Sequence, residues 1–182
     1  MCGIIGVALR RGNSAEEVYF GLERLEYRGY DSAGLTVRSD GGEMVTVKRG
    51  GRVANLKDGA AELCGSVAIG HTRWATHGEP NDKNAHPHTS GAFSVVHNGI
   101  IENYRELKDE LSEKGAKFVS DTDSEVIVRL IDYYYGGDVL AAVAKAAARL
   151  KGSFALGILC ADFKGIIAVK YKSPAVVGFG EN

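Results

Sequence analysis

The chain has 182 residues, of which 45% are hydrophobic and 25% charged, and its formal net charge is -1. This is the composition of a globular protein with a hydrophobic core, and the length suits one domain. The 22 basic and 23 acidic side chains form no long run of either sign, which argues against nucleic-acid binding. No apolar stretch reaches the roughly 20 residues of a membrane span, and no signal-peptide pattern precedes the first apolar run. We therefore expect a cytoplasmic protein that does not contact a membrane.

The first half of the chain is predicted to contain strands interrupted by two helices, because short β-branched runs alternate with apolar residues at helical spacing. Ser14 and Glu17 resemble a capping box that starts the first helix, and Gly29 is expected to stop it. The predicted elements are a strand over 4–9, a helix from 14, a hairpin of strands over 35–37 and 44–47, a helix over 52–63 and a strand over 67–69.

The second half is predicted to place its helices between strands. A strand is expected over 93–96, followed by helices over 103–114, 124–134 and 139–150, and then by strands over 154–160, 166–170 and 175–178. Neighbouring strands joined by hairpin turns favour antiparallel sheets. The expected class is therefore α+β with mostly antiparallel sheets.

The three cysteines, Cys2, Cys64 and Cys160, lie far apart and form no CxxC pair, so we expect neither a structural disulfide nor a zinc site. Cys160 lies in an apolar run and is predicted to be a core residue, whereas Cys64 fits the core or the surface. Cys2 follows the initiator Met1. If Met1 is removed, Cys2 carries a thiol and a free amine, which can act as a nucleophile and its general base. The alternative is an inert buried cysteine.

A long polar loop follows the strand over 67–69 and contains four of the five histidines, His71, His77, His86 and His88. Their spacing matches no helical pair of metal ligands, so no metal site is expected. The loop could be a plain surface segment, but connections of about 20 residues in a compact domain are often functional. Arg73 offers a planar guanidinium suited to a carboxylate.

Two further polar clusters follow apolar strands or precede a helix. Asn98 and Gly99 either form a simple turn or supply an amide and a backbone N–H to a developing oxyanion. The run 120–125 resembles helix-capping chemistry, but one of its carboxylates could hold an ammonium group. A cysteine, a carboxylate binder, an oxyanion pair and an ammonium binder together predict a site for an α-amino acid with a side-chain amide.

Several blocks of the sequence also resemble a known family. They are Cys2 to Gly6, Leu25 to Gly34, His71 to Pro80, Asn84 to His88, His97 to Tyr104 and Ser120 to Glu125. The chain is similar to class II glutamine amidotransferases of the N-terminal-nucleophile type, and in particular to the glutaminase domains of glutamine–fructose-6-phosphate aminotransferases. Amidophosphoribosyltransferases share the Cys-Gly-Ile start, but the blocks around Tyr27 and Thr72 look like the aminosugar branch.

The resemblance implies a four-layer α/β/β/α sandwich and assigns roles to nine residues. Cys2 would attack the side-chain amide of glutamine after Met1 is removed, and Asn98 with Gly99 would form the oxyanion hole. The α-carboxylate of glutamine would be bound by Arg73, Thr76 and His77, and its α-ammonium by Asp123. Trp74 and His86 would belong to a loop that closes over glutamine. No cofactor is implied.

The resemblance also implies partners beyond this chain. Family members continue into a sugar isomerase domain that uses the released ammonia, and this domain is absent here, so residues 1–182 would be the glutaminase domain alone. Full-length members are expected to form homodimers. Two alternatives from other classes stay open: a glutamine sensor that binds without turnover, and a thiol peroxidase, although the latter lacks a resolving cysteine near Cys2 in the sequence.

Overall fold

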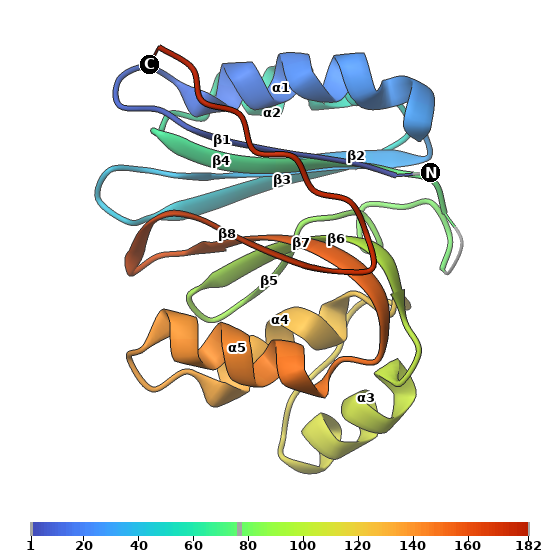
Figure 1. Ribbon diagram of the computed structural model, residues 1–182. Helices are drawn as coiled ribbons and strands as arrows, with labels where there is room; N and C mark the ends of the chain where they lie inside the picture. The colour runs from blue at the N-terminus through green and yellow to red at the C-terminus, as the bar shows by residue number, and fades with distance from the viewer. Residues whose placement is uncertain (1, 76–77, 182) are drawn as a thin grey trace.

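The computed structural model describes residues 2–75 and 78–181, and within them two four-stranded sheets, each antiparallel throughout (Figure 1). The first sheet has the strand order β1 (Gly3–Ala8), β4 (Val67–Arg73), β2 (Ser32–Arg38) and β3 (Met44–Gly50). The second has the order β5 (His88–Ser90), β6 (Phe93–Ile101), β7 (Gly152–Cys160) and β8 (Phe163–Tyr171). The sheets lie face to face.

Helices cover the outer face of each sheet (Figure 1). The first sheet carries α1 (Ser14–Leu25) and α2 (Lys57–Ala61), with short 3₁₀ helices η1 (Glu26–Arg28) and η2 (Val53–Leu56) beside them. The second sheet carries α3 (Tyr104–Glu113), α4 (Glu125–Tyr134) and α5 (Val139–Arg149). The order of layers is therefore helix, sheet, sheet, helix, which confirms the predicted α/β/β/α sandwich.

Three separate hydrophobic clusters hold these four layers together, as the layer order requires. One lies between α1, α2 and the first sheet and includes Leu22 and Leu35. The largest lies between the second sheet and helices α3 to α5. The third is small and joins the two sheets, with Ile69 of β4 and Val96 of β6 among its members. The polar site described below lies in the same layer between the sheets.

The alternation of side chains along β4 decides which of its residues reach that layer. Val67 and Ile69 face the second sheet, whereas Ala68 packs in the cluster under α1. The same period of two directs His71 and Arg73 toward the second sheet. On β6, Val96 faces the first sheet, so Asn98 two residues later faces it as well. One strand from each sheet thus sends polar residues into the space between the sheets.

Some sequence predictions about local structure are wrong. The cap of α1 is Asn13, whose Oδ1 accepts from the N–H of Ala15 at 3.2 Å, while the Ser14 hydroxyl donates to the Gly65 carbonyl at 2.8 Å. The predicted capping box fails because Ser14 lies inside the helix and a tertiary contact takes its hydroxyl. Within the helix predicted over 52–63, only residues 53–61 are helical, as η2 and α2.

The strand expected over 175–178 is also absent. Residues 174–181 belong to no strand, and Val176 is 95% exposed. An apolar β-branched run forms a strand only when a neighbour supplies the hydrogen bonds, and the described residues provide no partner strand there. The three-residue strand β5 was not predicted. No helix among residues 2–75 and 78–181 is long and apolar enough to cross a membrane.

Candidate active site

Cys2 lies immediately before β1, and three other segments meet around it. Its Sγ accepts a hydrogen bond from the backbone N–H of Trp74 at 3.2 Å and lies 3.6 Å from the Trp74 carbonyl. The Cys2 carbonyl accepts from Arg28 Nε at 3.3 Å and from Asn98 Nδ2 at 3.1 Å. The thiol is half-buried, so it is held in place and still accessible.

Gly29 permits the close approach that brings Trp74 to the sulfur. A Cβ at this position would lie 2.6 Å from the carbonyl carbon of Arg73 and 2.8 Å from the Trp74 nitrogen, which is too close for any side chain. Asp31 binds the same segment, since its Oδ2 accepts from the N–H of Ala75 at 2.8 Å and its N–H donates to the Arg73 carbonyl at 3.1 Å. The run 28–31 therefore supports the segment that faces the Cys2 thiol.

Asn98 and Gly99 lie on β6 beside Cys2, and they do not form the simple turn that was the alternative. The Asn98 side chain bridges the two sheets, because Nδ2 donates to Cys2 and Oδ1 lies 2.9 Å from His71 Nε2. Gly99 has φ +129, a conformation that L side chains rarely adopt, and a Cβ there would collide with the Ser153 carbonyl. Only glycine fits at this exposed position.

Arg73 ends β4 with its guanidinium buried in the site, as the residue is only 4% exposed. Its Nη1 donates to the Glu79 carbonyl at 3.3 Å and its Nη2 to the Gly78 carbonyl at 3.2 Å. Burial lowers the pKa of Arg73, and the nearby acidic groups of Cys2, Asp31 and Asp123 oppose that shift. Arg73, Cys2 and the two carboxylates are thus close enough to influence one another.

Asp123 is a buried carboxylate at the start of α4, 8% exposed. It does not cap the helix as the sequence suggested. Its Oδ2 accepts from the N–H of Ile101 on β6 at 2.8 Å, and its Oδ1 accepts from the Ser124 hydroxyl at 3.2 Å. That hydroxyl lies 2.8 Å from His97 Nδ1. A carboxylate has about four lone-pair positions, so Asp123 retains acceptor capacity for a ligand.

The polar loop after β4 is anchored to the segment 119–124. The Asn84 carboxamide accepts from the N–H of Asp121 at 2.9 Å, and Lys83 Nζ lies 3.1 Å from Asp121 Oδ2. His88 Nε2 lies 3.1 Å from the Thr122 hydroxyl. The fold therefore brings Asn98, Gly99 and the run 120–125 to the polar loop that follows β4.

Four histidines are buried together between the sheets: His71, His86, His88 and His97. The His86 ring lies 4.2 Å from that of His71 and 4.7 Å from that of His88. Burial lowers the pKa of all four, to about 3 for His71 and about 4 for His97, so all are neutral at pH 7. No group of three His, Cys, Asp or Glu in the described parts of the chain is arranged to hold a metal ion.

The remaining candidate residues differ in position. Trp74 is 45% exposed and forms an edge contact with Tyr30, 5.6 Å between ring centroids, at the mouth of the site. His86 is interior, 4% exposed, and packs on His71. Thr76 and His77 lie outside the described residues. Cys160 is buried as predicted, and Cys64 is on the surface.

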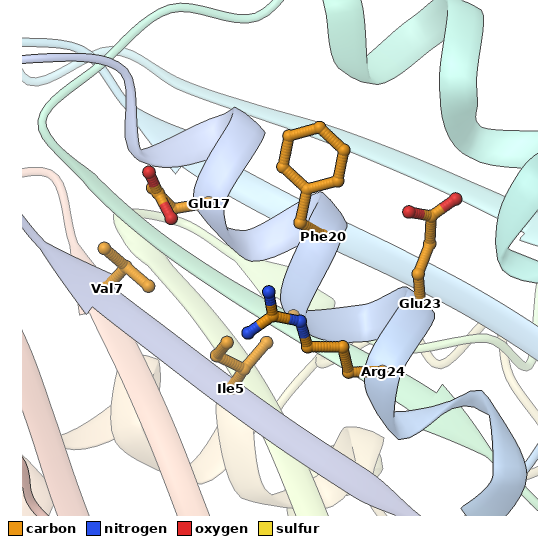
Figure 2. A pocket seen from close by; sticks show the side chains of 7 residues that line it. Ile5, Val7, Glu17, Phe20, Glu23 and Arg24 are labelled. Atoms are coloured by element: carbon orange, nitrogen blue, oxygen red, sulfur yellow. The ribbon is translucent and has the colours of Figure 1, made fainter.

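A separate groove of about 610 Å³ lies on the other side of β1. Figure 2 shows Ile5 and Val7 of β1 beneath the outer side of α1, which carries Glu17, Phe20 and Arg24. Its lining is aliphatic and aromatic with charged groups around it, and it contains no nucleophile. Ile5 and Val7 pack in the cluster under α1, away from the second sheet.

No role of its own was predicted for His71. Its spacing of two from Val67 and Ile69 indicates that it faces the same side of the strand as they do, between the sheets. The sequence does not indicate its partner Asn98, which lies 27 residues away on the other sheet.

Comparisons with known proteins bear on this site. Residues 71–171 match a family model described as "Glutamine amidotransferase domain". Glutamine–fructose-6-phosphate aminotransferase (isomerizing) of Clostridium tetani is 50% identical over the whole of this chain, and that of Thermus thermophilus is 48% identical. The chain covers 30% of the length of each.

A solved structure of glutamine phosphoribosylpyrophosphate amidotransferase from B. subtilis, complexed with ADP and GMP, has a similar fold. It superposes with a TM-score of 0.76 at 26% identity, over 88% of this chain and 35% of that one.

Proposed function

Because the chain belongs to the glutamine amidotransferase domain family, we propose that it hydrolyses glutamine to glutamate and ammonia through a thioester on Cys2. The observation that carries this proposal is the contact set of Cys2, whose sulfur accepts an N–H from Trp74 while its carbonyl binds the Asn98 amide. These contacts support the proposal because a cysteine thiol and a side-chain amide donor lie close together.

In the proposed reaction, Cys2 Sγ attacks the amide carbon of the glutamine side chain and forms a tetrahedral intermediate. Asn98 Nδ2 and the Gly99 N–H stabilise its oxyanion. The carbon–nitrogen bond then breaks, and the nitrogen takes a proton and leaves as ammonia. Water attacks the thioester, which releases glutamate and restores the thiol. The amine of Cys2, free once Met1 is removed, serves as the general base and acid.

Arg73 and Asp123 are proposed to bind the α-carboxylate and the α-ammonium of glutamine. A planar guanidinium matches a carboxylate, and a buried carboxylate with remaining acceptor capacity matches an ammonium. Thr76 and His77 are proposed to join Arg73, and Trp74 and His86 to belong to the loop over the substrate. Of these two, Trp74 lies at the mouth, while His86 packs inside.

The ammonia is proposed to pass to a sugar isomerase region that forms glucosamine 6-phosphate from fructose 6-phosphate. Relatives that are 47–50% identical over essentially the whole chain carry the name glutamine–fructose-6-phosphate aminotransferase, and the chain covers only about 30% of their length. The phosphoribosylpyrophosphate enzyme is more distant, at 26% identity. This difference favours the aminosugar branch.

The test is glutamate and ammonia release from glutamine by protein whose intact mass shows that Met1 is gone. Cys2→Ala is expected to lower kcat by more than about 10³-fold and leave the fold intact, since it removes the nucleophile. Cys64→Ala, the same change at an exposed cysteine, is the matched control and should retain full activity. Normal turnover by Cys2→Ala would refute the proposal, and calorimetric glutamine binding without turnover by the processed wild type would favour the sensor.

A further inference from the structure

The ring of His71 crosses from the first sheet to the second beside the nucleophile. His71 pairs with Ile4 of β1 across the sheet, and its Nε2 lies 3.0 Å from the His97 carbonyl oxygen and 2.9 Å from Asn98 Oδ1. A backbone carbonyl can only accept a hydrogen bond. Nε2 must therefore carry the hydrogen, and the ring is in the Nε2–H form.

This tautomer decides how the Asn98 amide is turned. The two ends of a carboxamide have nearly the same shape, and its terminal torsion has two broad wells, so sterics alone do not select one orientation. The atom that faces a ring N–H must be the oxygen. Nδ2 is then directed to the other side, toward Cys2, and lies 3.1 Å from the Cys2 carbonyl.

The His97 carbonyl and Asn98 Oδ1 share the Nε2–H of His71, and the rest of the ring has no hydrogen-bond partner among the described residues. Its Nδ1 is buried without a hydrogen bond to any of them, and one ring face packs against His86. The residue is fully buried, and burial keeps the ring neutral by lowering its pKa to about 3. One N–H in a fixed place is thus what the ring contributes.

We propose that His71 is a positioning residue for the oxyanion hole: its Nε2–H holds Asn98 Oδ1 so that Nδ2 faces Cys2 and the reacting amide. This inference rests on the proposed glutaminase function. A reversed amide would direct its oxygen at the developing oxyanion and repel it. The Cys2 carbonyl selects the same orientation as His71, so loss of His71 weakens the selection without abolishing it.

Two substitutions of similar shape separate the hydrogen bond from the packing. In His71→Gln the amide nitrogen lies four bonds from Cα, as Nε2 does in histidine, and it can donate. In His71→Met a methyl group occupies that place and cannot. We expect His71→Met to lower kcat for glutamine hydrolysis at least about tenfold with KM changed less than about twofold, and His71→Gln to recover most of kcat.

The split between kcat and KM follows from the geometry, because Asn98 would bind only the oxyanion, while Arg73 and Asp123 would bind the substrate's α-groups. His88→Gln is the control for loss of a buried histidine, since His88 contacts Thr122 and has no hydrogen bond to Asn98. It should keep kcat within about twofold. Equal activity of His71→Met and the wild type, or equal loss in His71→Met and His71→Gln when both are folded, would overturn the proposal.

A second measurement does not depend on turnover. Long-range ¹H–¹⁵N spectra report which ring nitrogen of a histidine carries the proton, and the His71 signals are identified by their loss in His71→Gln. We expect the Nε2–H form at pH 7; an Nδ1–H form would refute the inference. An inactive wild-type domain with the Nε2–H form would count against the proposed function and leave the orientation of Asn98 supported.

Discussion

Lowering the pH is expected to destabilise the domain through the four histidines buried between the sheets. In the folded state their pKa values are lowered by burial, to about 3 for His71 and about 4 for His97, whereas an unfolded histidine titrates near 6.5. The unfolded chain then binds more protons than the folded one below pH 6.5. This contribution to stability is complete above the unfolded pKa and is lost as the pH falls from 6.5 toward the folded values.

The size of the effect follows from these shifts. At about pH 5 His71 and His97 each favour the unfolded state by about 2 kcal/mol. Together they cost about 4 kcal/mol against a typical domain stability of about 5–15 kcal/mol, and His86 and His88, whose pKa values burial also lowers, act in the same direction. Glu110, whose pKa the Arg149 and Lys114 side chains lower to about 2, titrates below this window. The loss between about pH 6.5 and 5 therefore belongs to the histidines.

The assay is urea unfolding followed by circular dichroism at several pH values between about 7 and 5. The free energy of unfolding should fall by about 2 kcal/mol or more per pH unit below pH 6. His71→Gln removes one titrating ring and should reduce the loss at about pH 5 by about 2 kcal/mol. A stability that changes by less than about 1.4 kcal/mol per pH unit, the effect of one proton, would refute the reasoning.

Two further predictions concern the effects of packing and charge. Gly29→Ala should lower glutaminase activity more than about tenfold and the free energy of unfolding by about 1–3 kcal/mol, because the new Cβ meets the Arg73 backbone. Gly136→Ala is the control, since a Cβ there has no atom within 4 Å. Equal effects of the two substitutions in kinetics and in urea unfolding would contradict this prediction. Glu125→Gln should cost about 3 kcal/mol or more in urea unfolding, because the 2% exposed carboxylate pairs with Arg129 and accepts from Ser120 N–H. Glu110→Gln is the comparison: its carboxylate pairs with Lys114 and Arg149 but is more exposed to solvent, so the loss should be smaller, about 1 kcal/mol. The reverse order would exclude this account.

Local patterns predicted most of the elements and the class of the fold. The short apolar run 67–69 and the helical patterns over 124–134 and 139–150 depend on side chains close in sequence, and the structure has β4, α4 and α5 there. The capping box at Ser14 failed because the Gly65 carbonyl, 51 residues away, takes the hydroxyl. The run 175–178 failed because a strand needs a neighbour, which its own residues cannot provide.

The candidate site was likewise predicted only in part. Residue chemistry indicated Cys2, Arg73, Asn98 and one carboxylate of the run 120–125, since a thiol, a guanidinium, an amide and a carboxylate have recognisable uses wherever they lie. The family resemblance singled out Asp123. Residue chemistry could not show that Asp123 binds the Ile101 backbone rather than its own helix, or that His86 is packed inside. Both depend on which segment the fold places opposite the side chain.

The sequence by itself thus determined most of the elements, the layer order through its family resemblance, and the set of candidate reactive groups. Only the tertiary structure decided how those groups meet: Gly29 admits the Arg73–Trp74 backbone to Cys2, and His71 reaches Asn98 across the two sheets. The physical reason is the distance along the chain over which each interaction acts. Backbone periodicity and side-chain chemistry are local properties, whereas the orientation of one amide depends on an N–H that approaches from another sheet.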